Sequence, residues 1–304
     1  MGTKLRGLIT NIYIYSIAFS TFPLFWNSIP SISISTVQET FGLLFWSLLC
    51  IAAEYRPIMI PKGREIHEIT LSFAIHVSAI ILLGTENAVL IAMVATLLVE
   101  ILSRKSWYKV LFNTGQYGIS IWLGGSIYYL LKTTPAGSFD ILVDILPFLV
   151  GSTVYIILNL FFVSAVIALT SGNAFLDIFI EDFKVIIGYY YAVVPISGAI
   201  ALLYDPSHPY VILIMTPPLI MADIALRRYY SLQQETQETL KVLANIIDER
   251  DEYTYDHSDR VAEYARKIAE HLQLPLSTID EIEMAGRIHD LGKIDYNFQK
   301  KLMG

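Results

Sequence analysis

The stretch LPFLVGSTVYIILNLFFVSAVIAL, residues 146–169, decides the fold of most of this chain. It contains no charged residue, and it is longer than the roughly 20 apolar residues that a helix needs to cross the hydrocarbon core of a bilayer. A surface helix of a soluble protein would carry charged residues on its outer face. The stretch therefore predicts a transmembrane helix.

Similar apolar segments occur on both sides of this stretch. They cover residues 7–29, 36–53, 69–84, 88–103, 107–131, 183–204 and 209–226. We therefore expect an all-α fold with a polytopic bundle of eight transmembrane helices. The segments 69–84 and 88–103 are short and are separated by Thr85, Glu86 and Asn87, which favours a tight helical hairpin over one long helix.

Charge divides the chain into two parts. The whole sequence of 304 residues is 54% hydrophobic and 16% charged, with a mean hydropathy of +0.53, which excludes a disordered or collagen-like chain. Residues 1–226 hold 23 charged residues, whereas the much shorter segment 227–304 holds 26. We expect a transmembrane region at 1–226, a cytoplasmic connector helix at 227–250 and a soluble domain that starts at 251 and runs to 304.

The composition argues against nucleic-acid binding and against structures that need several cysteines. The net charge is −7 without a basic face, which argues against a nucleic-acid polymer as partner. The chain has one cysteine, Cys50, so it forms no intramolecular disulfide and no zinc site of the CxxC type.

The basic residues predict the orientation, because Lys and Arg are retained on the cytoplasmic side. With eight spans and a cytoplasmic N-terminus, Lys132 is the only basic residue in the outer loops. The inner segments hold Lys4, Arg6, Arg56, Lys62, Arg64, Arg104, Lys105, Lys109, Lys184, Arg227 and Arg228. We therefore expect a multi-pass protein of a bacterial-type cytoplasmic membrane, with the lipid bilayer as its surroundings and both termini in the cytoplasm.

Polar side chains inside the predicted spans are the candidates for a ligand pocket in the membrane, because a polar group in hydrocarbon needs a partner. They are His76, Glu100, Asn113, Gln116, Asn159 and Asp223. The simpler alternative is that they form hydrogen bonds between helices and fix the packing. The small residues Ser120 and Gly124 favour this alternative, because they let helices approach closely. A transporter is a weaker alternative, since the sequence shows no internal repeat.

The connector at residues 229–250 is polar and contains no Gly or Pro, so it is expected to continue the eighth helix into the cytoplasm. Leu232, Leu240, Leu243 and Ile247 lie at helical spacing. This pattern fits a short coiled coil between two copies of the chain, and equally a plain spacer.

The soluble end contains two predicted helices. Residues 258–272 alternate at helical spacing between apolar and charged positions, with Val261, Ala262, Ala265, Ile268, Ala269 and Leu272 on the apolar face. Ser277 is expected to cap the second helix, which brings Ile279, Ile282, Ala285 and Ile288 to the same core.

Three residues near the ends of these helices form a candidate metal site. His257 starts the first helix, and His289 with Asp290 ends the second. Imidazole and carboxylate groups suit a divalent ion such as iron, manganese or zinc, which can activate water for phosphate-ester hydrolysis. Lys293 could then stabilise the developing charge. Two histidines beside short helices would otherwise be ordinary surface or cap residues.

The strings DERDEYTYDHSDRVAEYARKIAEHL, residues 248–272, and AGRIHDLGKI, residues 285–294, together resemble the N-terminal part of the HD-type metal-dependent phosphohydrolases. The branch with the HD-GYP cyclic-di-GMP phosphodiesterases is the most similar. The resemblance implies that His257, His289 and Asp290 are metal ligands and that Lys293 is catalytic or contacts phosphate. It also implies a phosphate ester, such as a cyclic dinucleotide, as substrate.

The sequence departs from that family at two points. Asp256 stands where the family usually has Gly, and no histidine follows Lys293 before the last residue, Gly304. The resemblance therefore implies that the chain holds about the first third of the domain, and we expect a fragment of a longer protein. The expected function is a membrane-bound sensor phosphohydrolase. The alternative is a non-catalytic membrane sensor or binding module with a truncated domain.

Overall fold

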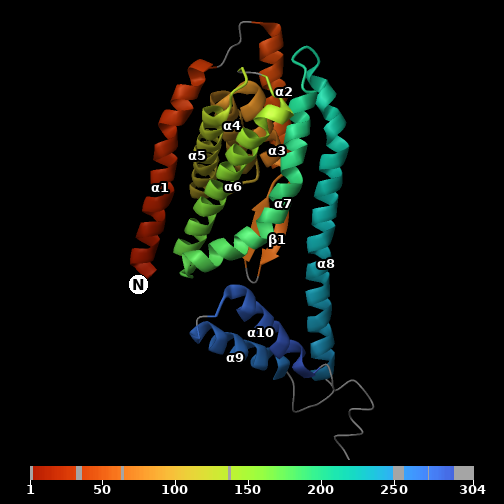
Figure 1. The fold of residues 1–304 in the computed structure, drawn as a ribbon. Helices are drawn as coiled ribbons and strands as arrows, with labels where there is room; N and C mark the ends of the chain where they lie inside the picture. Colours follow the sequence, from red (N-terminus) through yellow and green to blue (C-terminus); the bar gives the residue numbers. More distant parts are fainter. Residues whose placement is uncertain are drawn as a thin grey trace, which may run out of the picture. The chain divides into compact units, whose positions relative to one another are not determined.

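The computed structural model describes residues 3–31, 36–62, 65–135, 138–248, 257–272 and 274–290. The elements in this part of the chain are almost all helical (Figure 1). In chain order they are α1 (Thr3–Ser28), the 3-10 helix η1 (Ile29–Ser31), α2 (Val37–Glu54), β1 (Ile58–Lys62), β2 (Glu65–Ile69), α3 (Ser72–Leu83), α4 (Thr85–Leu102), α5 (Trp107–Leu131), α6 (Ile141–Ser171), α7 (Phe175–Leu203), the 3-10 helix η2 (Pro209–Met215), α8 (Thr216–Asp248), α9 (His257–His271) and α10 (Leu276–Ile288).

The expected all-α fold class is confirmed, but the count of eight transmembrane spans is not. Five helical segments among the described residues are long and apolar enough to cross a membrane. They are Leu5–Ser28, Thr85–Leu102, Ile141–Ser171, Ile186–Leu203 and Pro209–Ala244. Helix α3 has only 12 residues, which at about 1.5 Å per residue is roughly half the thickness of the hydrocarbon core.

Two further local differences separate the expectation from the structure. Ile69, expected to start the third span, ends the strand β2, which pairs with β1 in a two-stranded sheet. The residues Thr85, Glu86 and Asn87, expected to form a turn, start α4 instead. Gly84 alone makes the turn, with a φ of 90° that a residue with a side chain would rarely adopt.

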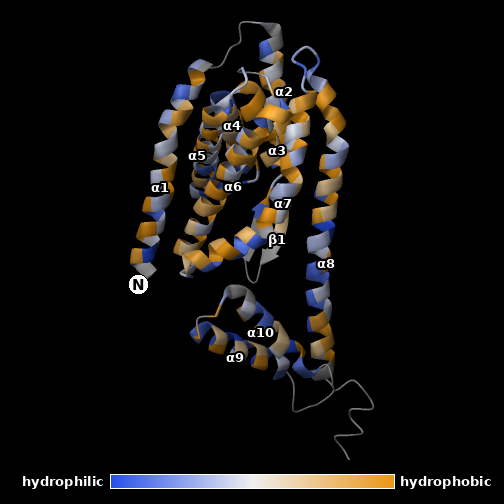
Figure 2. Ribbon diagram, in the orientation of Figure 1, coloured by the Kyte–Doolittle hydropathy of each residue, from blue (hydrophilic) through white to orange (hydrophobic). Residues whose placement is uncertain are grey.

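The described residues divide into two compact units. The first comprises residues 1–58 and 69–223, and the second comprises 59–68 and 224–304. In the first unit α5 packs against α1, α4 and α6, while α7 packs against α3 and α6. Hydrophobic residues dominate these helices (Figure 2). Trp46, Tyr128 and Tyr155 are among the largest fully buried side chains.

Helices α5 and α6 approach each other closely at two glycines. A Cβ atom on Gly124 would lie 2.8 Å from the carbonyl oxygen of Gly151, and a Cβ on Gly151 would lie 2.8 Å from the Cβ of Tyr128. Such distances are shorter than van der Waals contact. The expectation of a close helix approach at Gly124 therefore agrees with the structure, and Gly151 is the partner position on α6.

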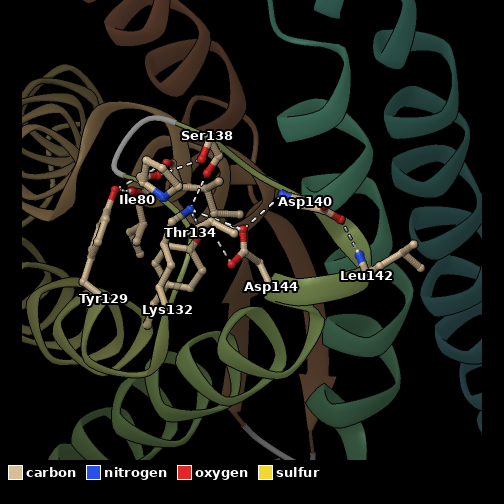
Figure 3. A network of polar contacts seen from close by, with 11 residues as sticks. Ile80, Tyr129, Lys132, Thr134, Ser138, Asp140, Leu142 and Asp144 are labelled. Carbon is tan, nitrogen blue, oxygen red and sulfur yellow. Dashed lines mark hydrogen bonds and ion pairs between the residues drawn. The ribbon is translucent and has the colours of Figure 1, made fainter.

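A buried ion pair closes the loop between α5 and α6 (Figure 3). The Lys132 ammonium lies 3.4 Å from Asp144 Oδ2, and the two side chains are 2% and 0% exposed. Asp144 also accepts hydrogen bonds from the Thr134 hydroxyl, at 2.7 and 2.9 Å, and from the backbone N–H of Asp140 at 3.0 Å. Lys132 donates to the Tyr128 hydroxyl at 2.9 Å and to the Ser138 carbonyl. The network satisfies both charges, so Lys132 acts as an internal partner of Asp144.

Helix α8 is one continuous helix from Thr216 to Asp248, and the second unit takes up the chain again within it, at Ile224. The expected continuation of the last apolar segment into the polar connector is therefore observed as far as Asp248. Arg250, the last residue of the expected connector, lies outside the described residues. Leu232 and Leu243 are 64% and 40% exposed, so these two members of the expected apolar stripe stay accessible in the described chain.

Candidate metal site

Helices α9 and α10 pack against each other as a pair. Ala262, Ala269 and Ile279 are buried between them, at 0%, 2% and 3% exposure. Ile268 and Leu272, expected in the same core, are 61% and 64% exposed, and Ala285 is exposed as well. The apolar face of α9 is therefore wider than the surface that α10 covers.

Gly286 sets the distance between the two helices. A Cβ atom on Gly286 would lie 3.1 Å from the Cα and 3.3 Å from the backbone nitrogen of Ala262. Since both neighbours are backbone atoms, no side chain could move aside to make room. Ala262 lies five residues after His257, and Gly286 lies three residues before His289. The contact between them therefore fixes the helix ends that carry the two histidines.

Ion pairs on both sides of this contact hold the helices in register. The Arg266 guanidinium on α9 lies 2.9 Å from Asp280 and 2.5 Å from Glu283 on α10. Burial lowers the pKa of Arg266, but the hydrogen bonds that its guanidinium donates to Glu283 and Asp280 outweigh this effect and raise the pKa. A further ion pair has its arginine on α10, where Arg287 pairs with Asp259 on α9.

This packing brings the three predicted ligands together. His257 is the first residue of α9, and His289 is the C-cap residue of α10. One ligand atom from each of His257, His289 and Asp290 lies within 4.8 Å of the other two, and the ring centroids of the histidines are 5.4 Å apart. Asp290 is nearly buried, with 9% of its surface exposed.

The hydrogen bond of His289 favours a metal-binding tautomer. Its Nδ1 lies 2.7 Å from the carbonyl oxygen of Gly286, and because a carbonyl can only accept, the proton belongs on Nδ1. In the neutral ring Nε2 then carries a lone pair, and this atom faces Asp290 Oδ1 at 3.3 Å. Metal-binding histidines usually donate their other N–H to such an acceptor. The residues present therefore fit a divalent ion, and Gly286 is a supporting residue that the sequence did not reveal.

Several predicted residues cannot be placed. Lys293, Asp256 and Gly292 lie outside the described residues.

The second helix begins at Leu276 with Pro275 as its N-cap residue and no side-chain cap. Ser277, expected to cap it, therefore lies within the first turn of α10 instead.

Five of the six polar residues expected in the membrane form hydrogen bonds between helices. His76 Nδ1 lies 2.7 Å from the Tyr155 hydroxyl. The Asn159 amide donates to Gln116 at 2.9 Å, and the Asn113 amide donates to Glu100 at 2.7 Å. These contacts join different helices, as the packing alternative requires. A ligand pocket formed by His76, Glu100, Asn113, Gln116 and Asn159 stays a prediction.

Two protein families match the chain. The MASE9 family matches residues 9–231, which is most of the first unit and the start of α8. The HD domain family matches residues 254–302, which includes all three candidate ligands. No solved structure is significantly similar to the chain.

Two curated proteins are similar to parts of the chain. A 3'3'-cGAMP-specific phosphodiesterase 1 from Vibrio cholerae serotype O1 is 30% identical over 61 residues, which cover 20% of this chain and 14% of the relative. A CRISPR-associated nuclease/helicase Cas3 from Methanothermobacter thermautotrophicus is 41% identical over 78 residues, covering 26% of this chain and 8% of the relative. The chain thus spans about one seventh of the first relative and less of the second.

These matches agree with the helical bundle in the first unit and with the His, His and Asp cluster in the second. The chain belongs to the MASE9 family of membrane-associated sensor domains and carries an HD domain after it.

Proposed function

We propose that this protein is a membrane sensor whose HD domain hydrolyses a phosphodiester, with a cyclic dinucleotide as the substrate class, at a divalent metal held by His257, His289 and Asp290. The observation that carries the proposal is the convergence of these three ligand atoms within 4.8 Å at the ends of α9 and α10. The similarity to a cGAMP phosphodiesterase supports the substrate class.

The residues would divide the work as follows. His257 and His289 present imidazole nitrogens, and Asp290 contributes the negative charge. Gly286 orients the His289 ring through its carbonyl oxygen. The resemblance implies that Lys293 is catalytic or contacts the phosphate of the substrate. An ion such as iron or manganese, when bound, polarises the phosphoryl oxygen and lowers the pKa of its water.

Metal binding by the purified chain in lipid nanodiscs tests this assignment. We expect Mn²⁺, measured by calorimetric titration, to bind the wild-type chain. His257→Ala and His289→Ala should each weaken binding by at least about tenfold, since each removes a ligand. His271→Ala is the matched control, because His271 is an exposed histidine at the other end of α9. Equal affinities in all four proteins would contradict the proposed site.

We further propose that both termini lie in the cytoplasm and that α8 pairs with α8 of a second copy of the chain. If the chain crosses the membrane eight times, the distribution of basic residues supports the orientation. The exposed Leu232 and Leu243 on a continuous helix support the pairing, because exposed apolar residues at this spacing can pack between two helices.

Single cysteines test both proposals in intact cells. With Cys50→Ser as background, a cysteine introduced by Ser138→Cys in the α5–α6 loop should react with a membrane-impermeant maleimide. One introduced by Leu243→Cys on α8 should react only after the membrane is opened, and mild oxidation should link it to a second chain. Labelling of Leu243→Cys in sealed cells would contradict the orientation. Failure to crosslink would contradict the pairing.

A further inference from the structure

A buried carboxylate in the first unit lacks a partner on one of its oxygens. Glu54 is the last residue of α2 and is 7% exposed. Its Oε1 atom is buried and makes no hydrogen bond. An ionised carboxylate that is removed from water without full compensation is costly, so this oxygen requires an explanation.

Hydroxyl groups gather at this carboxylate. The side chains of Ser72 and Thr70, at the junction of β2 and α3, lie near Glu54. The two hydroxyls also bond to each other at 2.7 Å. The Tyr117 side chain on α5 reaches the Thr70 hydroxyl as well. Glu54 therefore faces a group of oxygen atoms contributed by three parts of the bundle.

The neighbouring tyrosines do not supply the missing hydrogen bond. Tyr155 bonds to His76 Nδ1 at 2.7 Å, Tyr189 donates to the Thr70 carbonyl at 2.6 Å, and Tyr190 donates to Asn159 at 3.3 Å. All three lie close enough to interact electrostatically with Glu54. The hydroxyl protons of Tyr189 and Tyr190 are directed to other acceptors, and the Tyr155 hydroxyl is already paired with His76.

The charges at this place do not balance either. A second buried carboxylate, Glu100, lies near Glu54, and Lys105 is the cation that acts on both. Lys105 binds Glu100 Oε1 at 3.0 Å, and Asn113 donates to the same oxygen. Glu100 Oε2 is buried and makes no hydrogen bond. Among the described residues, these two carboxylates, when both are ionised, and the one ammonium leave one negative charge.

We infer that a monovalent metal cation, Na⁺ or K⁺, binds at Glu54 between α2, the β2–α3 junction and α5. One positive charge balances the group, and carboxylate and hydroxyl oxygens are the ligands that hard cations prefer. The inference concerns the membrane-associated unit and stands apart from the phosphohydrolase activity proposed for the HD domain.

Thermal unfolding of the purified chain in nanodiscs tests the inference. NaCl or KCl replaces N-methylglucamine chloride at constant ionic strength, so that only the small cation changes. We expect the Tm of the wild-type chain to rise with the concentration of Na⁺ or K⁺, because a ligand that binds the folded state stabilises it by mass action. The cation that gives the response identifies the ion.

Substitutions locate the site. Glu54→Gln removes the charge, so its Tm should no longer depend on Na⁺ or K⁺ and should be at least as high as that of the wild type without them. Glu54→Asp retains the charge on a shorter side chain and should raise the half-saturating concentration by about tenfold or more. Glu86→Gln is the control, since Glu86 is an exposed carboxylate in the first turn of α4, and it should respond as the wild type does.

Three results would overturn the inference. The first is a wild-type Tm that is equal in Na⁺, K⁺ and N-methylglucamine. The second is an unchanged cation response in both Glu54 variants. The third is a response to methylammonium alone, which would assign the site to an organic ammonium held by the tyrosine rings.

Discussion

Gly286 links the packing of α9 and α10 to the geometry of the candidate metal site. Its missing side chain allows the backbone of α10 to approach Ala262, and its carbonyl oxygen orients His289. One residue thus controls both the separation of the helices and the direction of a ligand ring. This role is invisible in the sequence, where Gly286 lies within a predicted helix and carries no functional group.

We predict that Gly286→Ala separates the two helices and weakens metal binding. The added Cβ would lie 3.1 Å from the Ala262 backbone, and overpacking of this kind costs about 1–3 kcal/mol. Calorimetric titration with Mn²⁺ and thermal unfolding measure the two effects. Gly188→Ala in α7 is the control, because its Cβ would meet nothing within 4 Å, and a helical Gly→Ala change should stabilise by about 0.5–1 kcal/mol. Unchanged Mn²⁺ affinity in Gly286→Ala would contradict the role of this contact.

The elements differ in how well the sequence predicts them. The long apolar runs predicted α1, α5 and α6 because long apolar helices have a strong composition signal, and α1 and α6 are also among the candidate membrane spans. The charged and apolar pattern of residues 258–272 predicted α9 to within one residue at each end. The hairpin β1–β2 was missed, because its five-residue strands lie between apolar helices and were counted as a charged loop.

The grouping of His257, His289 and Asp290 was predictable, whereas the residues that support it were not. His257, His289 and Asp290 are polar residues at predicted helix ends, so their types and positions pointed to a shared site. Glu54 was missed because it lies at the end of an apolar segment, where a charged residue is expected to reach water. Ser72 and Thr70, which lie near it, follow a two-stranded sheet that the sequence did not predict.

The loop between α5 and α6 offers a prediction at the scale of the element. Lys132→Met would leave Asp144 as a buried charge without its cation, which typically costs about 3–5 kcal/mol. We expect a marked fall in the Tm of the purified chain in nanodiscs. The double variant Lys132→Met with Asp144→Asn removes both charges and keeps an acceptor for Thr134, so it should recover much of the loss. A double variant no more stable than Lys132→Met would show that the two charges are not coupled.

At the scale of the whole molecule, the uneven charge distribution predicted two units in different solvents. The MASE9 match ends at residue 231 and the HD domain match begins at residue 254. Helix α8 extends beyond the end of the MASE9 match as far as Asp248. The number of membrane crossings was less predictable, because α3 is apolar but short.

The central claim is that the HD domain is a metal-dependent phosphohydrolase. Its most direct test is hydrolysis of 3'3'-cGAMP and cyclic-di-GMP by the natural full-length protein in nanodiscs with Mn²⁺ or Fe²⁺. We predict turnover of at least one of them that chelator abolishes. His289→Ala should reduce it by about 100-fold or more, and His271→Ala should leave it unchanged. Turnover that persists in His289→Ala, or that never occurs with either metal, would contradict the claim.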